Sequence, residues 1–510
     1  MFNMRLVLLL FLFKFSSSSN ILGVFVVPSK SHHRALYPIF EKLAEQGHNI
    51  TVITAFPKFN KSLNNFHEVD ISFTREIYLS LMKKYYTRPY ADTSSIDIMS
   101  IALRIFTEIF EEVIALKHVR DLIDNKFDVL MVETVIPLAF FVGIKNKAPI
   151  IGISSLPGIL YTHDSLGNPS HPVLSPNFIL QMTEDSPTFY ERLTSVMFNT
   201  ALRFYYKLYI THRSDIIARK FFGDDVPSLS DIEKNMSLAF VTRNWVTNEI
   251  SPNVPNIVDI SLIQIKPKKA LPKDIQDFLD KSKRGVVYFS MGTNEPTYEM
   301  CKHKIEMIKD ALLSLPYDVL WKSDINITMS NNIMVKNWFP QNDILAHPNL
   351  RVFISQGGSH SLEEAVLNAV PLVLLPVYAD QGQNSRRISS KGMAEKLDIF
   401  TVTKEELAKT IIKVAETKRY RINALKLSKI IKDQPMKGVE KAVWWVEYVM
   451  RHKGARHLRS GFVDMPFYQY YLLDVMGFIG LLVVVIIFAF YKTLCCFKNL
   501  CRLDEKCKLQ

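Results

Sequence analysis

Two segments of the sequence bring serine, histidine and glycine together where an apolar run meets a helical pattern. The first segment follows the apolar run 21–28 and reads Ser29-Lys30-Ser31-His32-His33. The second follows the apolar run 351–355 and reads Gln356-Gly357-Gly358-Ser359-His360-Ser361. A histidine that titrates near neutral pH can take a proton from a hydroxyl group. Glycines and hydroxyl donors before a helix suit a phosphate, because free N–H groups and the helix dipole point at the anion.

Both segments also have a simpler interpretation. Ser361 and Glu364 form the Ser-x-x-Glu pattern of a capping box, which would only start a helix. Neighbouring side chains at a strand end point in different directions, so only one of His32 and His33 can face a shared site. The spacing alone leaves both interpretations open.

Elements of alternating type must position these segments. In the first half the sequence predicts strands at 21–28, 49–55, 127–132 and 149–154. A helical pattern that Gly47 closes joins the first two strands, which makes them parallel. A long helix is expected over about 95–122. The segment 160–240 is rich in Phe and Tyr and is expected to be irregular, and we expect these insertions to build an apolar pocket.

The alternation restarts after a proline- and lysine-rich segment, 246–273, which predicts a linker. An amphipathic helix is expected at 302–315, and strands at 285–291, 318–321, 333–336, 351–355 and 372–377. The predicted fold class is therefore α/β, with two doubly wound sheets that face a cleft. Ligands are expected beyond the carboxyl ends of the strands, where both Ser/His segments lie.

The two ends of the chain predict a compartment. Residues 1–19 combine Arg5, an apolar run and a stretch of serines, the pattern of a secretory signal peptide, with a buried first strand as the alternative. Residues 472–491 include 17 consecutive uncharged residues and predict a membrane-spanning helix rather than a buried core helix. Aromatic residues precede it, and the basic tail 492–510 follows, which predicts a type I topology with a cytosolic tail.

Smaller signals in the tail and the body fit this topology. Lys506 and Lys508 resemble a dilysine signal for retrieval to the endoplasmic reticulum, with a chance pair in a basic tail as the alternative. Four of the five cysteines lie in the tail, so the body, which holds only Cys301, cannot form an internal disulfide. Sequons for N-glycosylation occur at Asn49, Asn60, Asn235 and Asn326, and we expect Asn49, inside a predicted strand, to stay unmodified.

Composition narrows the function classes. The 510 residues are 48% hydrophobic and 22% charged, which is typical of a globular protein and excludes disorder or a disulfide miniprotein. The net charge of +12 is spread along the chain without a nucleic-acid motif, so no nucleic-acid partner is expected. A homo-oligomer is compatible with the sequence.

A long motif identifies a family resemblance. Residues 337–348 (NWFPQNDILAHP) and 353–384 (FISQGGSHSLEEAVLNAVPLVLLPVYADQGQN) resemble the signature of the UDP-glycosyltransferases, in particular the membrane-bound animal enzymes and their insect branch. The resemblance covers essentially the whole chain. It implies a GT-B fold of two Rossmann-like domains, with residues 20–245 binding the acceptor and 274–460 binding the UDP-sugar.

The resemblance also implies roles for the residues of the donor site. Trp338 would stack on the uracil, Gln341 would lie beside the uridine, and Glu364 would accept hydrogen bonds from the ribose. Ser361 would bind the diphosphate together with Gly292, Thr293, Gln356, Gly357 and Gly358. Asp380 and Gln381 would hold the sugar hydroxyls. The simpler alternatives are a loop cap for Asp380 and a core aromatic for Trp338.

For catalysis, the resemblance makes His32 the general base and His33 its rival. Glu133 stands where the family has an aspartate that orients the base, and Asp128 is the fallback at the other end of that strand. Gln356 replaces a diphosphate-contacting histidine, which predicts weaker binding of UDP. In the linker, Ser261-Leu262 and Gln264 replace a Gly-Gly-x-His pattern.

The implied reaction is a direct displacement at the anomeric carbon with inversion, which requires neither a metal nor a cofactor. No acid pair typical of a glycoside hydrolase is present. The insect branch suggests UDP-glucose as donor, with UDP-glucuronate as the alternative, and the aromatic insertions suggest a small lipophilic acceptor. The changes at Glu133 and Gln356 also motivate a catalytically silent, membrane-tethered binding protein. The expected location is the endoplasmic reticulum membrane, with both domains in the lumen.

Overall fold

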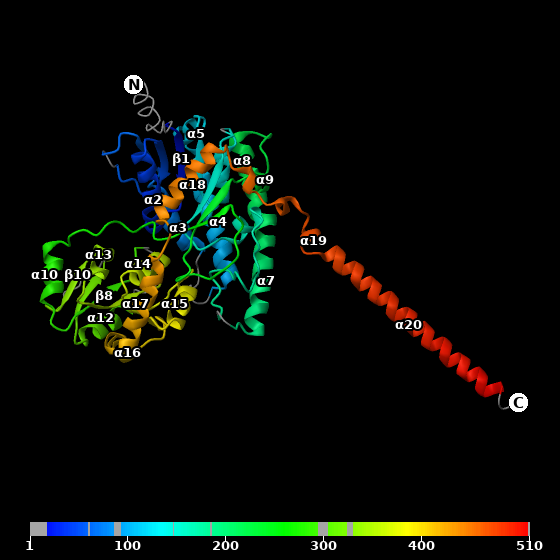
Figure 1. Cartoon of the computed structure of the whole chain (residues 1–510). Helices are drawn as coiled ribbons and strands as arrows, with labels where there is room; N and C mark the ends of the chain where they lie inside the picture. Colours follow the sequence, from blue (N-terminus) through cyan, green and yellow to red (C-terminus); the bar gives the residue numbers. More distant parts are fainter. Residues whose placement is uncertain are drawn as a thin grey trace, which may run out of the picture. The chain divides into compact units, whose positions relative to one another are not determined.

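The computed structural model describes residues 18–59, 62–85, 93–145, 147–183, 186–293, 304–323 and 330–507, with side chains as far as residue 498. Contacts divide the chain into two units, Met1–Arg459 and Ser460–Gln510. Residues 1–17 of the predicted signal peptide, the sequons at Asn60 and Asn326, Cys301 and Lys508 lie outside the described residues. The larger unit holds both predicted sheets (Figure 1).

The first sheet has seven parallel strands in the order β3-β2-β1-β4-β5-β6-β7. Its strands are β1 (Asn20–Phe25), β2 (Asn49–Thr54), β3 (Phe66–Asp70), β4 (Val129–Glu133), β5 (Ile150–Ser154), β6 (Leu238–Thr242) and β7 (Ile257–Ile260). Strand β7 lies inside the segment 246–273 that the sequence describes as a linker. The chain order reverses between β1 and β4, so a ligand site is expected beyond the carboxyl ends of these two strands.

Side chains of β1 alternate between two cores, as a buried strand requires. Leu22 and Val24 face a core that contains α4 (Ser95–Ala115) and α7 (Phe189–Tyr205). Ile21 and Phe25 face a second core, which contains α2 (Lys30–Glu45). A Cβ atom at Gly23 would come within 2.8 Å of the Phe40 ring, so glycine permits the close approach of α2 to the sheet. This approach places the first turn of α2 at the end of β1.

Two sequence predictions for the first half are wrong. The long helix expected over 95–122 is broken at Leu116, whose ψ of 125° is extended, into α4 and α5 (Lys117–Ile123). The segment 160–240, expected to be irregular, is largely helical. It forms α6 (Leu160–Ser165), α7, η3 (Tyr206–Thr211), α8 (His212–Phe222) and α9 (Leu229–Lys234). Phe198, Leu202, Ile210 and Ile217 recur at helical spacing and are buried, a period that the scattered aromatic residues obscure.

The second sheet has six parallel strands in the order β10-β9-β8-β11-β12-β13. They are β8 (Val286–Ser290), β9 (Asp318–Lys322), β10 (Ile333–Lys336), β11 (Leu350–Ser355), β12 (Leu372–Leu374) and β13 (Ala394–Lys396). Its helices include α10 (Lys273–Lys281), α12 (Ile305–Leu313), α13 (Gln341–Leu345), α14 (Ser359–Leu367), α15 (Gln381–Ser390), α16 (Lys404–Glu416) and α17 (Lys418–Lys432). The order reverses between β8 and β11. The predicted α/β class with two doubly wound sheets is confirmed.

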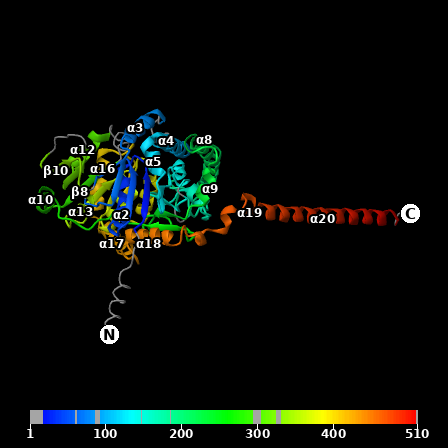
Figure 2. The ribbon, with the colours of Figure 1, turned by 90° about the horizontal axis from the view of Figure 1, so that it is seen from above.

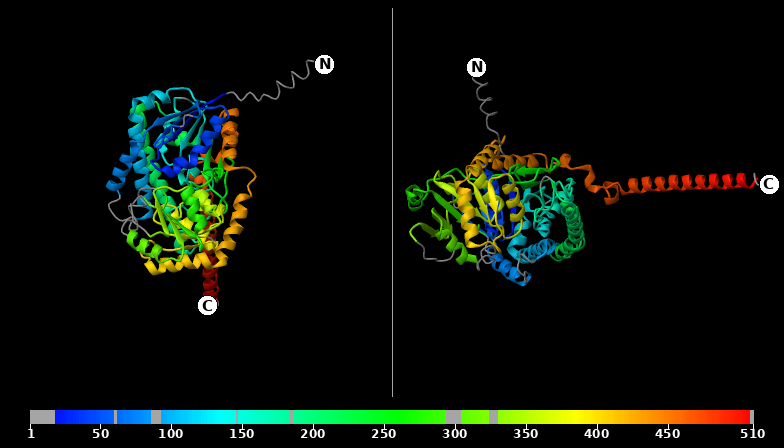
Figure 3. Two further views of the ribbon diagram at one scale, coloured as in Figure 1. Left: turned by 90° about the vertical axis from the view of Figure 1, so that its left-hand side faces the viewer. Right: turned by 90° about the horizontal axis from the view of Figure 1, so that it is seen from below.

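Helix α18 (Gly438–Arg451) belongs to the later part of the sequence but packs on the first sheet. Ala442, Val443, Val446 and Val449 are buried in the same core as Ile21 and Phe25. Figures 1 and 2 label both α18 and the preceding helix, α17. In the left panel of Figure 3 the orange part of the chain that contains these helices runs from one half to the other. The predicted range 274–460 for the second domain therefore includes a helix that completes the core of the first sheet.

The smaller unit contains α19 (Phe467–Tyr470) and α20 (Leu473–Cys507). The part of α20 from Leu473 to Lys498 contains an 18-residue window with a mean hydropathy of 2.8 and is long and apolar enough to cross a membrane. Within the described residues it is the one helix that meets this condition. A C-terminal candidate membrane helix is thus present where the sequence predicts one.

Candidate active site

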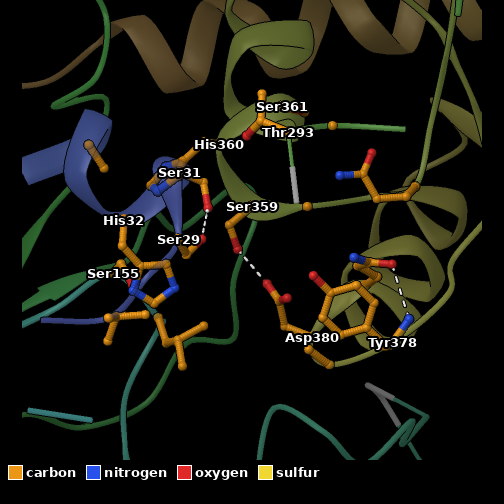
Figure 4. Close-up of a pocket in the computed structure, with 18 of the residues that line it drawn as sticks. Ser29, Ser31, His32, Ser155, Thr293, Ser359, His360, Ser361, Tyr378 and Asp380 are labelled. Atoms are coloured by element: carbon orange, nitrogen blue, oxygen red, sulfur yellow. Dashed lines mark hydrogen bonds between the residues drawn. The ribbon is translucent and has the colours of Figure 1, made fainter. Parts of the chain in front are cut away.

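One cavity of about 950 Å³ lies where the carboxyl ends of both sheets meet. Its wall includes eleven of the thirteen predicted site residues: His32, Gly292, Thr293, Trp338, Gln341, Gln356, Gly358, Ser361, Glu364, Asp380 and Gln381. Glu133 lies behind His32, and Gly357 forms the turn behind Gly358. Figure 4 shows Ser29, Ser31 and His32 of the first half opposite Ser359 and Asp380 of the second. The volume is near the upper end of the ~300–1,000 Å³ range of small-molecule sites.

Three neighbouring strands of the first sheet build the histidine site. His32 lies in the first turn of α2 after β1, Glu133 ends β4, and Ser155 follows β5. The Nδ1 atom of His32 is 2.5 Å from Oε1 of Glu133 and 2.7 Å from Oγ of Ser155. Glu133 is fully buried, whereas His32 is 19% exposed and borders the cavity.

The contact with Glu133 favours one arrangement of the proton on His32. The tautomer with its proton on Nδ1 donates a hydrogen bond to Oε1 of Glu133. Nε2 then carries the lone pair. The Oε2 atom of Glu133 is buried and has no hydrogen-bond partner among the described residues. The carboxylate therefore acts mainly on His32, and the pair can accept a proton at Nε2.

The two rivals from the sequence lie elsewhere. His33 is buried, with Nε2 2.9 Å from the carbonyl oxygen of Val27 and Nδ1 2.7 Å from the hydroxyl of Thr54. Burial lowers the pKa of His33 from 6.5 to about 3, so this side chain is a neutral part of the core. Asp128 precedes β4, at the amino end of this strand, whereas Glu133 lies at its carboxyl end. Asp128 accepts a hydrogen bond from the backbone N–H of Asn20.

The turn between β11 and α14 leaves room for an anion. Gly357 has a φ of +86°, and Gly292, after the neighbouring strand β8, has a φ of +82°. A Cβ atom at Gly292 would lie 2.2 Å from Nε2 of Gln356, so the glycine lets this amide reach the cavity wall. Helix α14 begins after Gly358 without a side-chain cap. Its first N–H groups have no acceptor within the helix and line a natural anion site.

The capping-box interpretation of Ser361 and Glu364 is wrong. Ser361 is the third residue of α14 rather than its N-cap, which is Gly358. Both side chains instead bind Gln341, whose Nε2 is 3.1 Å from Oγ of Ser361 and 2.7 Å from Oε2 of Glu364. Burial raises the pKa of Glu364, while the Gln341 amide and the charge of Arg34 act in the opposite direction. A buried polar cluster thus lies beside Trp338.

Trp338 is not a core aromatic. The ring is 40% exposed and borders the cavity, whereas the next residue, Phe339, is buried against Tyr288. Phe339 therefore anchors the loop after β10 and leaves Trp338 at the surface. An exposed indole held by a buried neighbour is suited to stack on a planar ring.

Asp380 and Gln381 lie at the start of α15, after β12. Asp380 has the N-cap position but makes no capping hydrogen bond, so the loop-cap interpretation is wrong. Its Oδ2 accepts from the hydroxyl of Ser359 at 2.8 Å and the amide of Asn384 at 2.6 Å. The Oε1 atom of Gln381 accepts from the backbone N–H groups of Val377 and Tyr378. Because this oxygen is occupied, Gln381 offers the cavity a donor, and Asp380 offers an acceptor.

The first half also contributes an apolar part of the cavity wall. It is lined by Met82, Ile98, Met99, Leu103, Phe106, Ile159, Phe178 and Ile179. Helix α4 supplies four of these residues, so the insertion between β3 and β4 forms this part of the pocket. A lipophilic molecule that lies here has a polar end within reach of His32.

The linker residues that depart from the family pattern border the same region. Leu262 has a φ of +55°, the left-handed conformation in which a glycine is easier to accommodate. Gln264 lines the cavity and donates from Nε2 to Oε2 of Glu363 at 2.9 Å. The linker thus contributes an amide in place of an imidazole.

Sequence reasoning missed several residues of the site. Ser155 directly follows a predicted strand, so the strand-end rule that selected His32 could have selected it too. Ser359 and Asn384, which position Asp380, carried no signal beyond their place in the motif. Arg34, which also lines the cavity, had none. Among the described residues there is no group of three or more His, Cys, Asp or Glu side chains that could hold a metal ion.

Comparison with known proteins extends these observations. Residues 23–509 match the family described as "UDP-glucoronosyl and UDP-glucosyl transferase". UDP-glycosyltransferase UGT5 of Dactylopius coccus is 35% identical over 95% of this chain and 94% of its own length. UDP-glucosyltransferase 2 of the same organism is 32% identical, over 91% and 90%. Human UDP-glucuronosyltransferase 2B7 is 30% identical, over 98% of both.

The fold is also similar to that of solved glycosyltransferases. The structure of Os79 from O. sativa, in complex with U2F and trichothecene, has a TM-score of 0.55 and 18% sequence identity. The similarity covers 84% of this chain and all of that one. At this identity the likeness concerns the arrangement of the two sheets.

Proposed function

This chain belongs to the UDP-glycosyltransferase family and is a UDP-sugar glycosyltransferase; from this premise we propose that it transfers glucose from UDP-glucose to a hydroxyl group of a small lipophilic acceptor, with inversion. The observation that carries the proposal is the contact between His32 and Glu133 in the wall of a cavity that also contains the donor motif. The proposed base and the proposed anion-binding turn thus border the same cavity.

His32 is the general base in the proposed reaction. Nε2 takes the proton of the acceptor hydroxyl while its oxygen attacks the anomeric carbon and the bond from that carbon to UDP breaks. The proton then resides on the imidazole, and Glu133 stabilises the imidazolium through Nδ1–H. This requires the neutral histidine with a free Nε2, which the contact to Glu133 favours.

The second half holds the donor and the departing UDP. Trp338 stacks on the uracil, Gln341 and Glu364 bind the uridine, and Asp380 and Gln381 bind the sugar. The N-terminus of α14, with Ser361, Gly357, Gly358, Gln356, Gly292 and Thr293, stabilises the charge that develops on the diphosphate. UDP is a good leaving group once this charge is stabilised, so the chemistry on these residues needs no proton donor.

Glucose is preferred to glucuronate because the carboxylate of Asp380 lies at the proposed sugar end, whereas the lysine and arginine residues among the described lining of the cavity, Arg34, Lys83 and Lys322, belong to other elements than α15. A uronate would bring a second carboxylate near Asp380, which like-charge repulsion disfavours. Among the described residues that line the cavity, the lysine nearest in strand order is Lys322 at the end of β9. Strand β9 is three positions from β12, or about 14 Å across the sheet. The name of one relative, a UDP-glucosyltransferase, agrees with this preference.

Two apolar features indicate the acceptor and the location: the cavity wall and the candidate membrane helix. The wall built by α4 favours lipophilic alcohols or phenols, which partition into membranes. We infer a type I protein of the endoplasmic reticulum, because the candidate span is followed by a basic tail with lysines at its end. Asn235, exposed at the end of α9, is then the sequon best placed for glycosylation.

The test is the release of UDP by membranes that contain the full chain. UDP-glucose and UDP-glucuronate are supplied in parallel with a panel of phenols and flavonoids, and the variant His32→Ala is measured beside the wild type. We expect release from UDP-glucose, reduced by about 10²–10⁴-fold in the variant.

Each part of the proposal can fail separately in this assay. If UDP is released only from UDP-glucuronate, the donor is UDP-glucuronate and not UDP-glucose. Undiminished activity of His32→Ala would remove the assignment of the base. Binding of UDP without release, for every acceptor, would favour the silent binding protein that the changes at Glu133 and Gln356 suggest.

A further inference from the structure

Two cations of the first half lie over the ring of Trp338, and one of them, Arg34, also lines the cavity. The Nζ atom of Lys30 lies 4.9 Å, and the Cζ atom of Arg34 5.1 Å, from the centroid of the Trp338 ring. Both distances are within the ~6 Å range of cation–π contacts. Lys30 and Arg34 are one turn apart on α2 and so are neighbours on its surface. Trp338, in contrast, lies in the loop between β10 and α13.

The first turn of α2 therefore contacts two different parts of the cavity. His32 lies between the two cations in sequence, and residues two apart point to roughly opposite sides of a helix. His32 contacts Glu133 and Ser155 of the first sheet, while Arg34 faces Trp338 of the second half. Figure 4 shows His32 beside Ser155, across from the start of α14. A ligand on Trp338 thus meets the helix that carries the proposed base.

We propose that Arg34, with Lys30, closes over the uracil ring when the donor stacks on Trp338, so that the base is held between the indole and the cations. This inference rests on the proposed function, since it takes Trp338 as the uracil site. Trp338 is 40% exposed, so a ring can reach it. The Arg34 side chain is long and exposed, and it can retreat by the thickness of one ring. A planar guanidinium stacks on aromatic faces, which an ammonium cannot do.

Charge supports the same assignment. The diphosphate of UDP is negative, and the turn after β11 offers the neutral amide of Gln356. Arg34 lines the cavity, and its charge opposes the effect of burial on the pKa of Glu364. The charge of Arg34 therefore acts on Glu364, the residue that is proposed to bind the ribose. A cation contributed by α2 supplies part of the positive charge that Gln356 lacks.

The experiment is calorimetric titration of UDP, without acceptor, into the purified full chain. The variants are Arg34→Ala, Arg34→Lys, Trp338→Ala and the double variant Arg34→Ala/Trp338→Ala. The matched control is Arg75→Ala, because Arg75 lies 5.2 Å from the ring of Phe56 in a cation–π contact outside the cavity.

We expect Arg34→Ala to weaken UDP binding about three- to thirtyfold, and Arg34→Lys to weaken it less. The double variant should lose less than the product of the two single losses, because both side chains hold the same ring. Arg75→Ala should bind UDP as the wild type does. In turnover, Arg34→Ala should raise the KM for UDP-glucose, whereas His32→Ala should lower kcat and leave UDP binding unchanged.

The opposite results would overturn the proposal. If Arg34→Ala binds UDP as tightly as the wild type, or more tightly, the cations only cover Trp338 while the site is empty. If Trp338→Ala leaves UDP binding unchanged, uracil does not stack there. The readout does not depend on sugar transfer. A wild type that binds UDP but transfers nothing would therefore refute the proposed function and leave this inference standing.

Discussion

At the scale of single residues, the site depends on one replacement that the chain accommodates. Glu133 stands where an aspartate is expected, and its carboxylate reaches Nδ1 of His32 at 2.5 Å from a fully buried position. The side chain of a glutamate is one methylene longer than that of an aspartate, and this length still allows the contact with the imidazole. His33, one residue away, has both ring nitrogens bonded in the core and cannot replace His32.

Substitutions of Glu133 test this contact. Glu133→Gln removes the charge and offers Nδ1 an amide, so we expect kcat to fall by about 10²–10⁴-fold with little change in the KM for UDP-glucose. Glu133→Asp keeps the charge but withdraws it by one methylene, and should retain more activity than Glu133→Gln. The measurement is kcat and KM as a function of pH. Wild-type kcat in Glu133→Gln would show that His32 acts without this partner.

At the scale of elements, a buried carboxyl joins three helices behind the cavity wall. Glu233 of α9 accepts a hydrogen bond from Tyr206 of η3 and another from Ser165 of α6. Tyr206 stacks on Tyr161, which lines the cavity, with 4.1 Å between the ring centroids. Burial raises the pKa of Glu233 from 4.5 to about 8.

The raised pKa predicts a loss of stability with rising pH. Between about pH 4.5 and 8 the folded chain keeps the proton on Glu233 and the unfolded chain releases it, so stability falls across this window and is constant above it. In Glu233→Gln this dependence should disappear. From pH 5 to pH 8 we expect the Tm of the variant to gain about 4 °C or more relative to the wild type.

Thermal unfolding at the two pH values, with Glu112→Gln as the exposed control on α4, measures this difference. A constant difference in Tm between Glu233→Gln and the wild type would mean that Glu233 is ionised in the folded protein.

At the scale of the whole molecule, the two halves of the larger unit are connected at several points. The linker amide of Gln264 binds Glu363 on α14. The buried guanidinium of Arg387 on α15 lies 2.9 Å from Glu249, which precedes β7. Helix α18 crosses back to complete the core of the first sheet. The position of His32 relative to the donor motif therefore depends on contacts from three separate segments.

Truncation tests the role of α18. Val443, Val446 and Val449 are buried on the first sheet, and burial of a valine contributes roughly 1.5–3 kcal/mol. Their sum, roughly 5–9 kcal/mol, is comparable to the ~5–15 kcal/mol of net stability of a typical protein. A chain that ends at residue 435 should therefore aggregate or unfold, whereas a chain that ends at residue 459 should stay folded. Solubility and circular dichroism of both truncations measure this, and equal stability would show that α18 is dispensable.

The sequence by itself determined the class of fold and predicted the two strand ends at which the chemistry is proposed. Strand–helix alternation produces parallel sheets, and parallel sheets bind ligands beyond their carboxyl ends, so the Ser/His and Gly/Ser segments could be selected from local patterns. The motif then predicted the donor residues. These conclusions need only periodicity, chain order and residue type.

Only the tertiary structure decided which neighbours these residues have. Local patterns cannot distinguish His32 from His33, because the difference lies in contacts with Glu133, about a hundred residues away, and with Val27 and Thr54. Helices α7 and α8 of the segment 160–240 pack against α4, which precedes them by more than seventy residues. The return of α18 to the first sheet and the meeting of Arg34 with Trp338 join segments that are distant in sequence. Such contacts arise from burial in a shared core and from the way the two halves meet, which no short window of sequence contains.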